Sequence, residues 1–93
     1  MLRQIYEAFL ADAPETIHRL SEALSRGDPV AIRESAHRLK GGSLNVGADR
    51  MAKTAQRLEI MGRDGVTEGG DADLGVLLEE LSRLEKELAP EAA

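Results

Sequence analysis

The carboxyl-terminal part of this 93-residue chain contains a stripe of leucines that limits which folds the chain can adopt. Between residues 72 and 88 leucines recur at helical spacing, at Leu74, Leu77, Leu78, Leu81, Leu84 and Leu88. The chain contains only two aromatic residues, Tyr6 and Phe9, so its core must be built from aliphatic side chains. Aliphatic residues at helical spacing favour a helical bundle over a β-sandwich or a barrel.

The first part of the chain contains start and stop signals for two helices. Residues 2–10 have apolar side chains at helical spacing and predict a short helix that lies across one end of the bundle. Asp12 as an N-cap, followed by Pro14 in the first turn, then predicts the start of a second helix. Gly27 stands where a left-handed residue would end this second helix.

Stronger signals mark the third helix. Asp28 is placed to cap it, Pro29 to begin it, and Gly47 to supply the positive φ that follows its end near residue 45. Two further helices are expected at residues 48–61 and 72–88, separated by a glycine-rich loop at 62–71. The sequence therefore predicts one domain over residues 1–93: an all-α, antiparallel up-down four-helix bundle with an additional short N-terminal helix.

Composition excludes several classes of function. The chain has no cysteine, so it has no disulfides and no thiolate metal site. No apolar run approaches the roughly 20 residues that span a membrane, so we expect no membrane contact and a cytoplasmic location. The net charge of −5 argues against a nucleic-acid-binding surface, which needs a cluster of basic residues.

The third predicted helix places a histidine on its outer face. At about 100° per residue, one side of this helix is small or apolar throughout and predicts the core-facing positions. These positions are Ile32, Ala36, Leu39, Ser43 and Val46. His37 falls almost opposite them, and its neighbours along the helix are Arg33, Lys40, Gly41 and Leu44. We therefore expect the imidazole to project into water. A cationic side chain and a glycine, which has no side chain to cover the imidazole, would lie next to it.

This combination of residues suits a nucleophile that takes up a phosphoryl group. A neutral imidazole is nucleophilic near neutral pH because its ordinary pKa is about 6.5. Lys40 can balance the charge of a bound dianion, and Gly41 leaves space over the imidazole for a partner. A glycine inside a helix costs about 1 kcal/mol relative to alanine, which favours a functional reason for Gly41. Gly42 lies nearer the core and favours close helix packing.

The pattern His37-x-x-Lys40-Gly41, with Gly47 six positions further on, resembles the signature of histidine phosphotransfer (HPt) domains of bacterial phosphorelays. The resemblance extends through residues 48–59, which end in Leu-Glu, and includes the opening run at residues 9–15. It implies that His37 accepts a phosphoryl group from one receiver-domain aspartate and passes it to another. It also implies a phosphocarrier without kinase activity of its own.

The resemblance carries further expectations about the site and its partners. Lys40 would stabilise the phosphate, Gly41 would give clearance, and Glu59 would orient the imidazole. Arg33 and Leu44 are candidate contacts for a partner because of their position on the outer face beside His37. The expected partners are receiver domains and a histidine kinase in cis or in trans. The domain would be monomeric and would need no cofactor of its own, with Mg²⁺ belonging to the receiver.

Two other functions are compatible with this sequence. One is a helical interaction module that binds a partner without phosphotransfer, and the other is the phosphoacceptor domain of a chemotaxis-type histidine kinase. Glu15-x-x-His18 and Glu34-x-x-His37 also match the spacing of di-iron carboxylate bundles. Both histidines, however, fall away from the apolar stripes, so a di-iron centre is excluded, and zinc lacks ligands.

Overall fold

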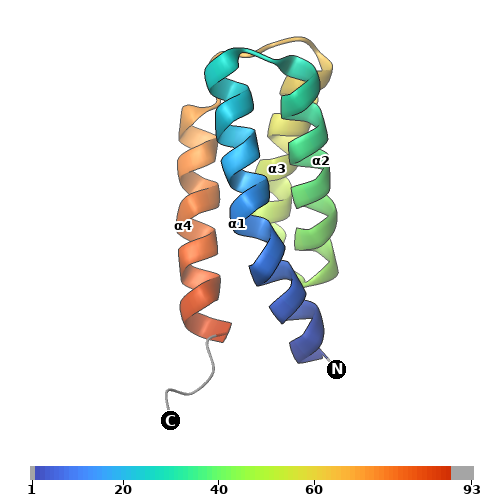
Figure 1. The fold of residues 1–93 in the computed structure, drawn as a ribbon, viewed down its shortest axis with the longest axis vertical. Helices are drawn as coiled ribbons and strands as arrows, with labels where there is room; N and C mark the ends of the chain where they lie inside the picture. The colour runs from blue at the N-terminus through green and yellow to red at the C-terminus, as the bar shows by residue number, and fades with distance from the viewer. Residues whose placement is uncertain (1, 89–93) are drawn as a thin grey trace.

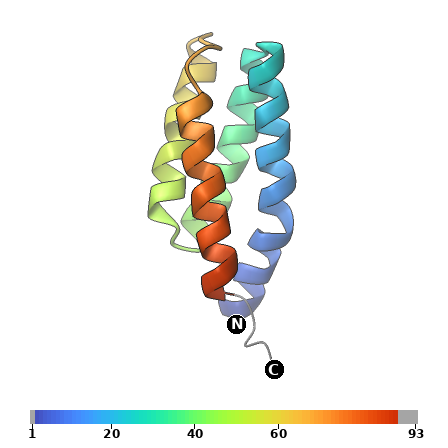
Figure 2. The same cartoon turned by 90° about the vertical axis from the view of Figure 1, so that its left-hand side faces the viewer.

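A computed structural model describes residues 2–88 of the chain, and the side chains of residues 3–87. It contains four helices: α1 (Leu2–Arg26), α2 (Pro29–Asn45), α3 (Asp49–Arg63) and α4 (Asp71–Leu88). The helices run alternately up and down, and α4 returns to pack beside α1 as well as α3 (Figures 1 and 2). The predicted antiparallel four-helix bundle is therefore confirmed.

The prediction of a separate N-terminal helix is wrong, because α1 is continuous from Leu2 to Arg26 and contains Pro14 in its interior. A proline there removes one backbone hydrogen bond and normally ends or kinks a helix. Here Phe9, Ala13 and Ile17 form one buried stripe across the proline, and their packing outweighs the local cost. The first turns of α1 lean toward the lower end of α2 in Figure 1.

Asp12 consequently has a different role from the predicted N-cap. Its two carboxylate oxygens accept hydrogen bonds from the Arg38 guanidinium of α2, at 2.8 and 3.1 Å. These hydrogen bonds lower the pKa of the Asp12 carboxyl below its ordinary value. The pair ties α1 to α2.

The buried core is aliphatic apart from Phe9 of α1. It includes the predicted core-facing positions of the helix that is now α2, together with Met51, Ala52, Ala55 and Leu58 of α3. In α4, Leu77 and Leu81 are buried and Leu74 and Leu84 are partly buried, whereas Leu78 of the same leucine stripe is exposed. Leu78 is 52% exposed because it lies one residue, about 100°, around the helix from Leu77. Two other predicted apolar positions, Leu2 and Leu88, have side chains outside the described part.

The predicted boundaries of α2 are confirmed. The Asp28 side chain accepts a hydrogen bond from the backbone N–H of Ala31 at 3.1 Å, and Pro29 occupies the first turn. Such a cap contributes about 1 kcal/mol to the stability of a helix. At the other end Gly47 has φ +75°, which favours glycine. The short connection that follows makes α3 the antiparallel neighbour of α2.

Gly62 belongs to the last turn of α3 rather than to the predicted loop. It is buried against the start of α2: a Cβ atom built on it would lie 2.7 Å from both the Pro29 carbonyl oxygen and the Arg33 backbone nitrogen. These are backbone atoms, so neither can move aside without shifting the helix. Gly62 therefore allows α3 to approach the first turn of α2 closely.

Gly62→Ala is expected to destabilise the fold by about 1–3 kcal/mol through overpacking. The matched control is Gly75→Ala on α4, where an added Cβ meets no atom within 4 Å. That substitution is expected to stabilise the helix by about 1 kcal/mol. Urea unfolding of both variants measures the difference, and equal stabilities would show that the two helices do not approach closely at Gly62.

Candidate phosphotransfer site

His37 lies in the middle of α2 with its side chain 70% exposed, on the face that the sequence predicted. Its Nδ1 atom lies 2.7 Å from Oε2 of Glu59 on α3. Glu59 reaches the histidine because it follows the fully buried Leu58 and so stands at the edge of the α2–α3 interface. The structure thus brings together two residues that are 22 positions apart in the sequence.

Lys40 joins the same cluster through Glu59 rather than through the histidine. Its Nζ atom lies 2.7 Å from Oε1 of Glu59, so one carboxylate contacts both the ammonium and the imidazole. The hydrogen bond from Lys40, with a further one from His37, holds the pKa of the Glu59 carboxyl below its ordinary value, although partial burial acts in the opposite direction. Glu59 therefore remains a carboxylate at neutral pH.

This geometry fixes which nitrogen of the imidazole is open. An ionised carboxylate can only accept hydrogen bonds, so the Nδ1 atom of His37 must donate its hydrogen to Glu59. In a neutral imidazole the hydrogen then resides on Nδ1, and Nε2 keeps its lone pair. The side chain is mostly exposed, so Nε2 is the nitrogen available to an incoming group.

The two adjacent glycines of α2 have different surroundings. A Cβ atom built on Gly41 would meet no atom within 4 Å, which places this residue in open space on the histidine side. A Cβ atom on Gly42 would lie 3.1 Å from Cδ1 of Phe9 in α1. Gly42 therefore permits close packing of α1 on α2, whereas no packing contact requires a glycine at position 41.

Gly41→Ala is expected to stabilise α2 by about 1 kcal/mol, since alanine is the better helix former and no atom is crowded. Gly41→Leu is expected to stay folded but to slow phosphotransfer from a receiver by roughly tenfold or more, because its side chain disturbs the alignment of the reacting groups. Thermal melts and transfer rates measure the two effects. A destabilised Gly41→Ala protein would contradict the open surroundings of this residue.

The other predicted site residues lie on the same exposed strip of α2. Arg33 is exposed and lines a shallow groove with Glu34, His37 and Glu59, and Leu44 is 60% exposed. The sequence analysis missed Val30, which is 56% exposed. Val30 precedes His37 by seven residues, as Leu44 follows it by seven, and this heptad spacing could have revealed it.

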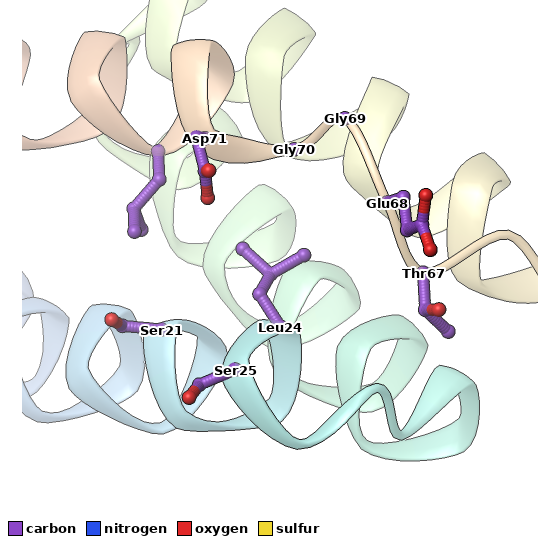
Figure 3. Close-up of a pocket in the computed structure, with 9 residues that line it drawn as sticks. Ser21, Leu24, Ser25, Thr67, Glu68, Gly69, Gly70 and Asp71 are labelled. Atoms are coloured by element: carbon purple, nitrogen blue, oxygen red, sulfur yellow. The ribbon is translucent and has the colours of Figure 1, made fainter.

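A second pocket lies away from the histidine, between the end of α1 and the segment that joins α3 to α4 (Figure 3). It is lined by Ser21, Leu24, Ser25, Thr67, Glu68, Gly69, Gly70, Asp71 and Leu74. It shares no residue with the His37 groove.

His18, the second histidine, lies on the exposed surface of α1 with its Nε2 atom 3.6 Å from the Glu22 carboxylate. The part of the chain that the structure describes contains no group of three or more metal-ligating side chains. None of its helices is both long enough and apolar enough to cross a membrane.

Comparisons with known proteins point to one family. The sequence profile of the Hpt domain matches residues 4–87. The crystal structure of histidine-containing phosphotransfer protein B from Pseudomonas aeruginosa superposes with a TM-score of 0.86 and 30% identity, covering 92% of this chain and 75% of that protein. The Hpt domain of a sensor hybrid histidine kinase from Shewanella has the same fold, with a TM-score of 0.80, 24% identity, and coverage of 92% and 74%. No curated protein sequence gave a match. The chain therefore belongs to the Hpt family, whose members carry out histidine phosphotransfer in phosphorelays.

Proposed function

We propose that Nε2 of His37 is the atom that accepts and donates the phosphoryl group. The observation that carries this proposal is the 2.7 Å contact between His37 Nδ1 and Glu59, on a side chain that is 70% exposed. The contact holds the imidazole in the tautomer in which Nε2 is nucleophilic. The exposure leaves that nitrogen accessible to the active site of another protein.

The transfer step places specific demands on Glu59. When Nε2 attacks an aspartyl phosphate, the P–N bond forms, the P–O bond breaks, and the aspartate leaves as a carboxylate. The imidazole still holds its Nδ1 hydrogen and therefore becomes cationic. The Glu59 carboxylate, already at hydrogen-bonding distance from Nδ1, stabilises that positive charge. Return of the phosphoryl group to a second aspartate reverses each change.

Lys40 supports the site in two ways. It keeps Glu59 ionised and in place through the 2.7 Å ion pair between Nζ and Oε1. An ammonium group has three N–H donors, so Lys40 has donors besides the one engaged by Glu59 with which to contact a phosphoryl oxygen. Gly41 contributes by the absence of a side chain beside the histidine.

The partners of Hpt domains are receiver domains and histidine kinases, and we propose that a receiver docks over α2. A receiver that delivers phosphate to His37 must cover this face. Val30 and Leu44 offer exposed apolar contacts two turns to either side of the histidine. Such a domain acts as a cytoplasmic, monomeric phosphocarrier in cis or in trans with a kinase, and Mg²⁺ would be held by the receiver.

The proposed function is tested by incubating the protein with phosphoramidate, a small phosphoryl donor, and then with a panel of phosphorylated receiver domains. Phosphohistidine is labile in acid and stable in base, which separates it from phosphoserine and from aspartyl phosphate. Label of this kind at His37 is the expected result. A protein that binds receivers but takes up no phosphate from either donor would be an interaction module instead.

Glu59→Gln is expected to slow phosphotransfer by about tenfold, because a neutral hydrogen bond replaces a charge-assisted one that is about twice as strong. The glutamine oxygen can still accept the Nδ1 hydrogen, so the tautomer is retained while the charge is lost. Glu22→Gln is the matched control, because Glu22 lies beside the other histidine, His18 on α1, and does not line the His37 groove. Equal rates for the two variants would show that the Glu59 charge has no part in the transfer.

A further inference from the structure

Arg33 differs from every other arginine in residues 2–88. Each of the others forms an ion pair with a carboxylate: Arg3, Arg19, Arg26, Arg38, Arg50, Arg57, Arg63 and Arg83. Arg33 is exposed and has no ion-pair partner within these described residues. It also lies one turn before His37 on the same helix. An unpaired guanidinium thus stands beside the nitrogen that we propose is phosphorylated.

The groove beside His37 is lined by Arg33, Glu34, His37 and Glu59. Side chains on a helix lean toward its N-terminus, so the imidazole lies over the turn that contains Arg33 and Glu34. Residues four apart have Cβ atoms about 5–6 Å apart, within easy reach of an arginine side chain. Since Nδ1 is held by Glu59, a phosphoryl group on Nε2 is within the range of the Arg33 guanidinium.

The charges in this groove favour a cation of this kind. An incoming phosphoryl dianion meets two carboxylates, Glu34 and Glu59. The Nζ atom of Lys40 lies 2.7 Å from Oε1 of Glu59, so these two opposite charges neutralise each other. Among the residues that line the groove, Arg33 is the cation whose charge remains to offset the dianion.

We infer that the Arg33 guanidinium binds the phosphoryl oxygens of the group carried on His37 Nε2. This inference rests on the proposed function and assigns Arg33 to the phosphoryl group rather than to the partner's surface. The planar guanidinium presents parallel N–H donors that match two oxygens of one phosphoryl group. Arg33 forms no covalent bond. It reduces the repulsion between the entering group and the two carboxylates.

The test uses phosphoramidate as the donor, because no receiver surface is then involved. In this reaction the P–N bond of phosphoramidate breaks, a P–N bond to Nε2 forms, and ammonia leaves. Arg33→Gln and Arg33→Ala are expected to lower the rate of label uptake by about threefold to tenfold, the range for an exposed charge-assisted hydrogen bond. Arg33→Lys is expected to lie between these variants and the wild type.

The matched control is Arg19→Gln, which removes one exposed arginine on α1, where Arg19 pairs with Glu15. It is expected to label at the wild-type rate. If the Arg33 variants also label at that rate, the inference is overturned, and slower transfer only from a receiver would make Arg33 a docking residue. If the wild-type protein takes up no label at His37 from phosphoramidate or from a phosphorylated receiver, the proposed function itself fails, and the inference fails with it.

Discussion

His37→Gln is expected to abolish phosphoryl uptake completely while leaving the free energy of unfolding within about 0.5 kcal/mol of the wild type. Glutamine has no nucleophilic nitrogen, so the covalent step cannot occur. The fold is not expected to change, because the His37 side chain is 70% exposed and Lys40 continues to satisfy the Glu59 carboxylate. Radiolabel uptake from a phosphorylated receiver, together with thermal melts of the same samples, measures both effects.

His18→Gln is the matched control for this experiment. It makes the same chemical change on a histidine that is 71% exposed and that also lies beside a glutamate, Glu22. The control is expected to retain full uptake and full stability. Uptake that survives in His37→Gln but disappears in His18→Gln would place the phosphoacceptor on α1 instead of α2.

Leu77→Ala has the largest expected effect on stability, a loss of about 2–5 kcal/mol. Leu77 is fully buried in the core, and shortening it leaves a cavity among rigid neighbours. Leu78→Ala, one position along the same helix, is the control. Leu78 is 52% exposed, so its replacement is expected to change stability by less than about 0.5 kcal/mol.

Urea unfolding separates these two leucine variants. Leu77→Ala is expected to take up phosphate normally at temperatures where it remains folded. Leu77 lies in the core, whereas His37 lies on the outer face of α2. Equal losses of stability from the two variants would contradict the observed orientation of α4. A folded Leu77→Ala protein that cannot be phosphorylated would show that the core and the site are coupled.

Local signals in the sequence were sufficient to predict the helix that carries the histidine. Asp28 and Pro29 fix where α2 begins, and Gly47 allows the turn that follows its end. The face of His37 also followed from the helical period alone, since its neighbours at Ala36 and Leu39 are buried. Each of these features depends on residues that are close together in the chain.

The features that could not be predicted depend on contacts between helices. Pro14 signals a helix start, but α1 passes through it because tertiary packing outweighs one lost hydrogen bond. Gly62 lies in the last turn of α3, where the absence of a side chain allows the backbone of α2 to approach closely. The same holds for the site: the sequence placed Glu59 near the imidazole, but only the structure shows that it also pairs with Lys40.

The most direct test of the account is to identify the phosphorylated nitrogen. The protein, labelled with ¹⁵N, is phosphorylated with phosphoramidate and examined by NMR, which distinguishes Nε2-phosphohistidine from Nδ1-phosphohistidine by the coupling of phosphorus to each ring nitrogen. The hydrogen bond between Nδ1 of His37 and Glu59 predicts a single product, with the phosphoryl group on Nε2 of His37. A phosphoryl group on Nδ1 of His37, or on His18, would contradict it.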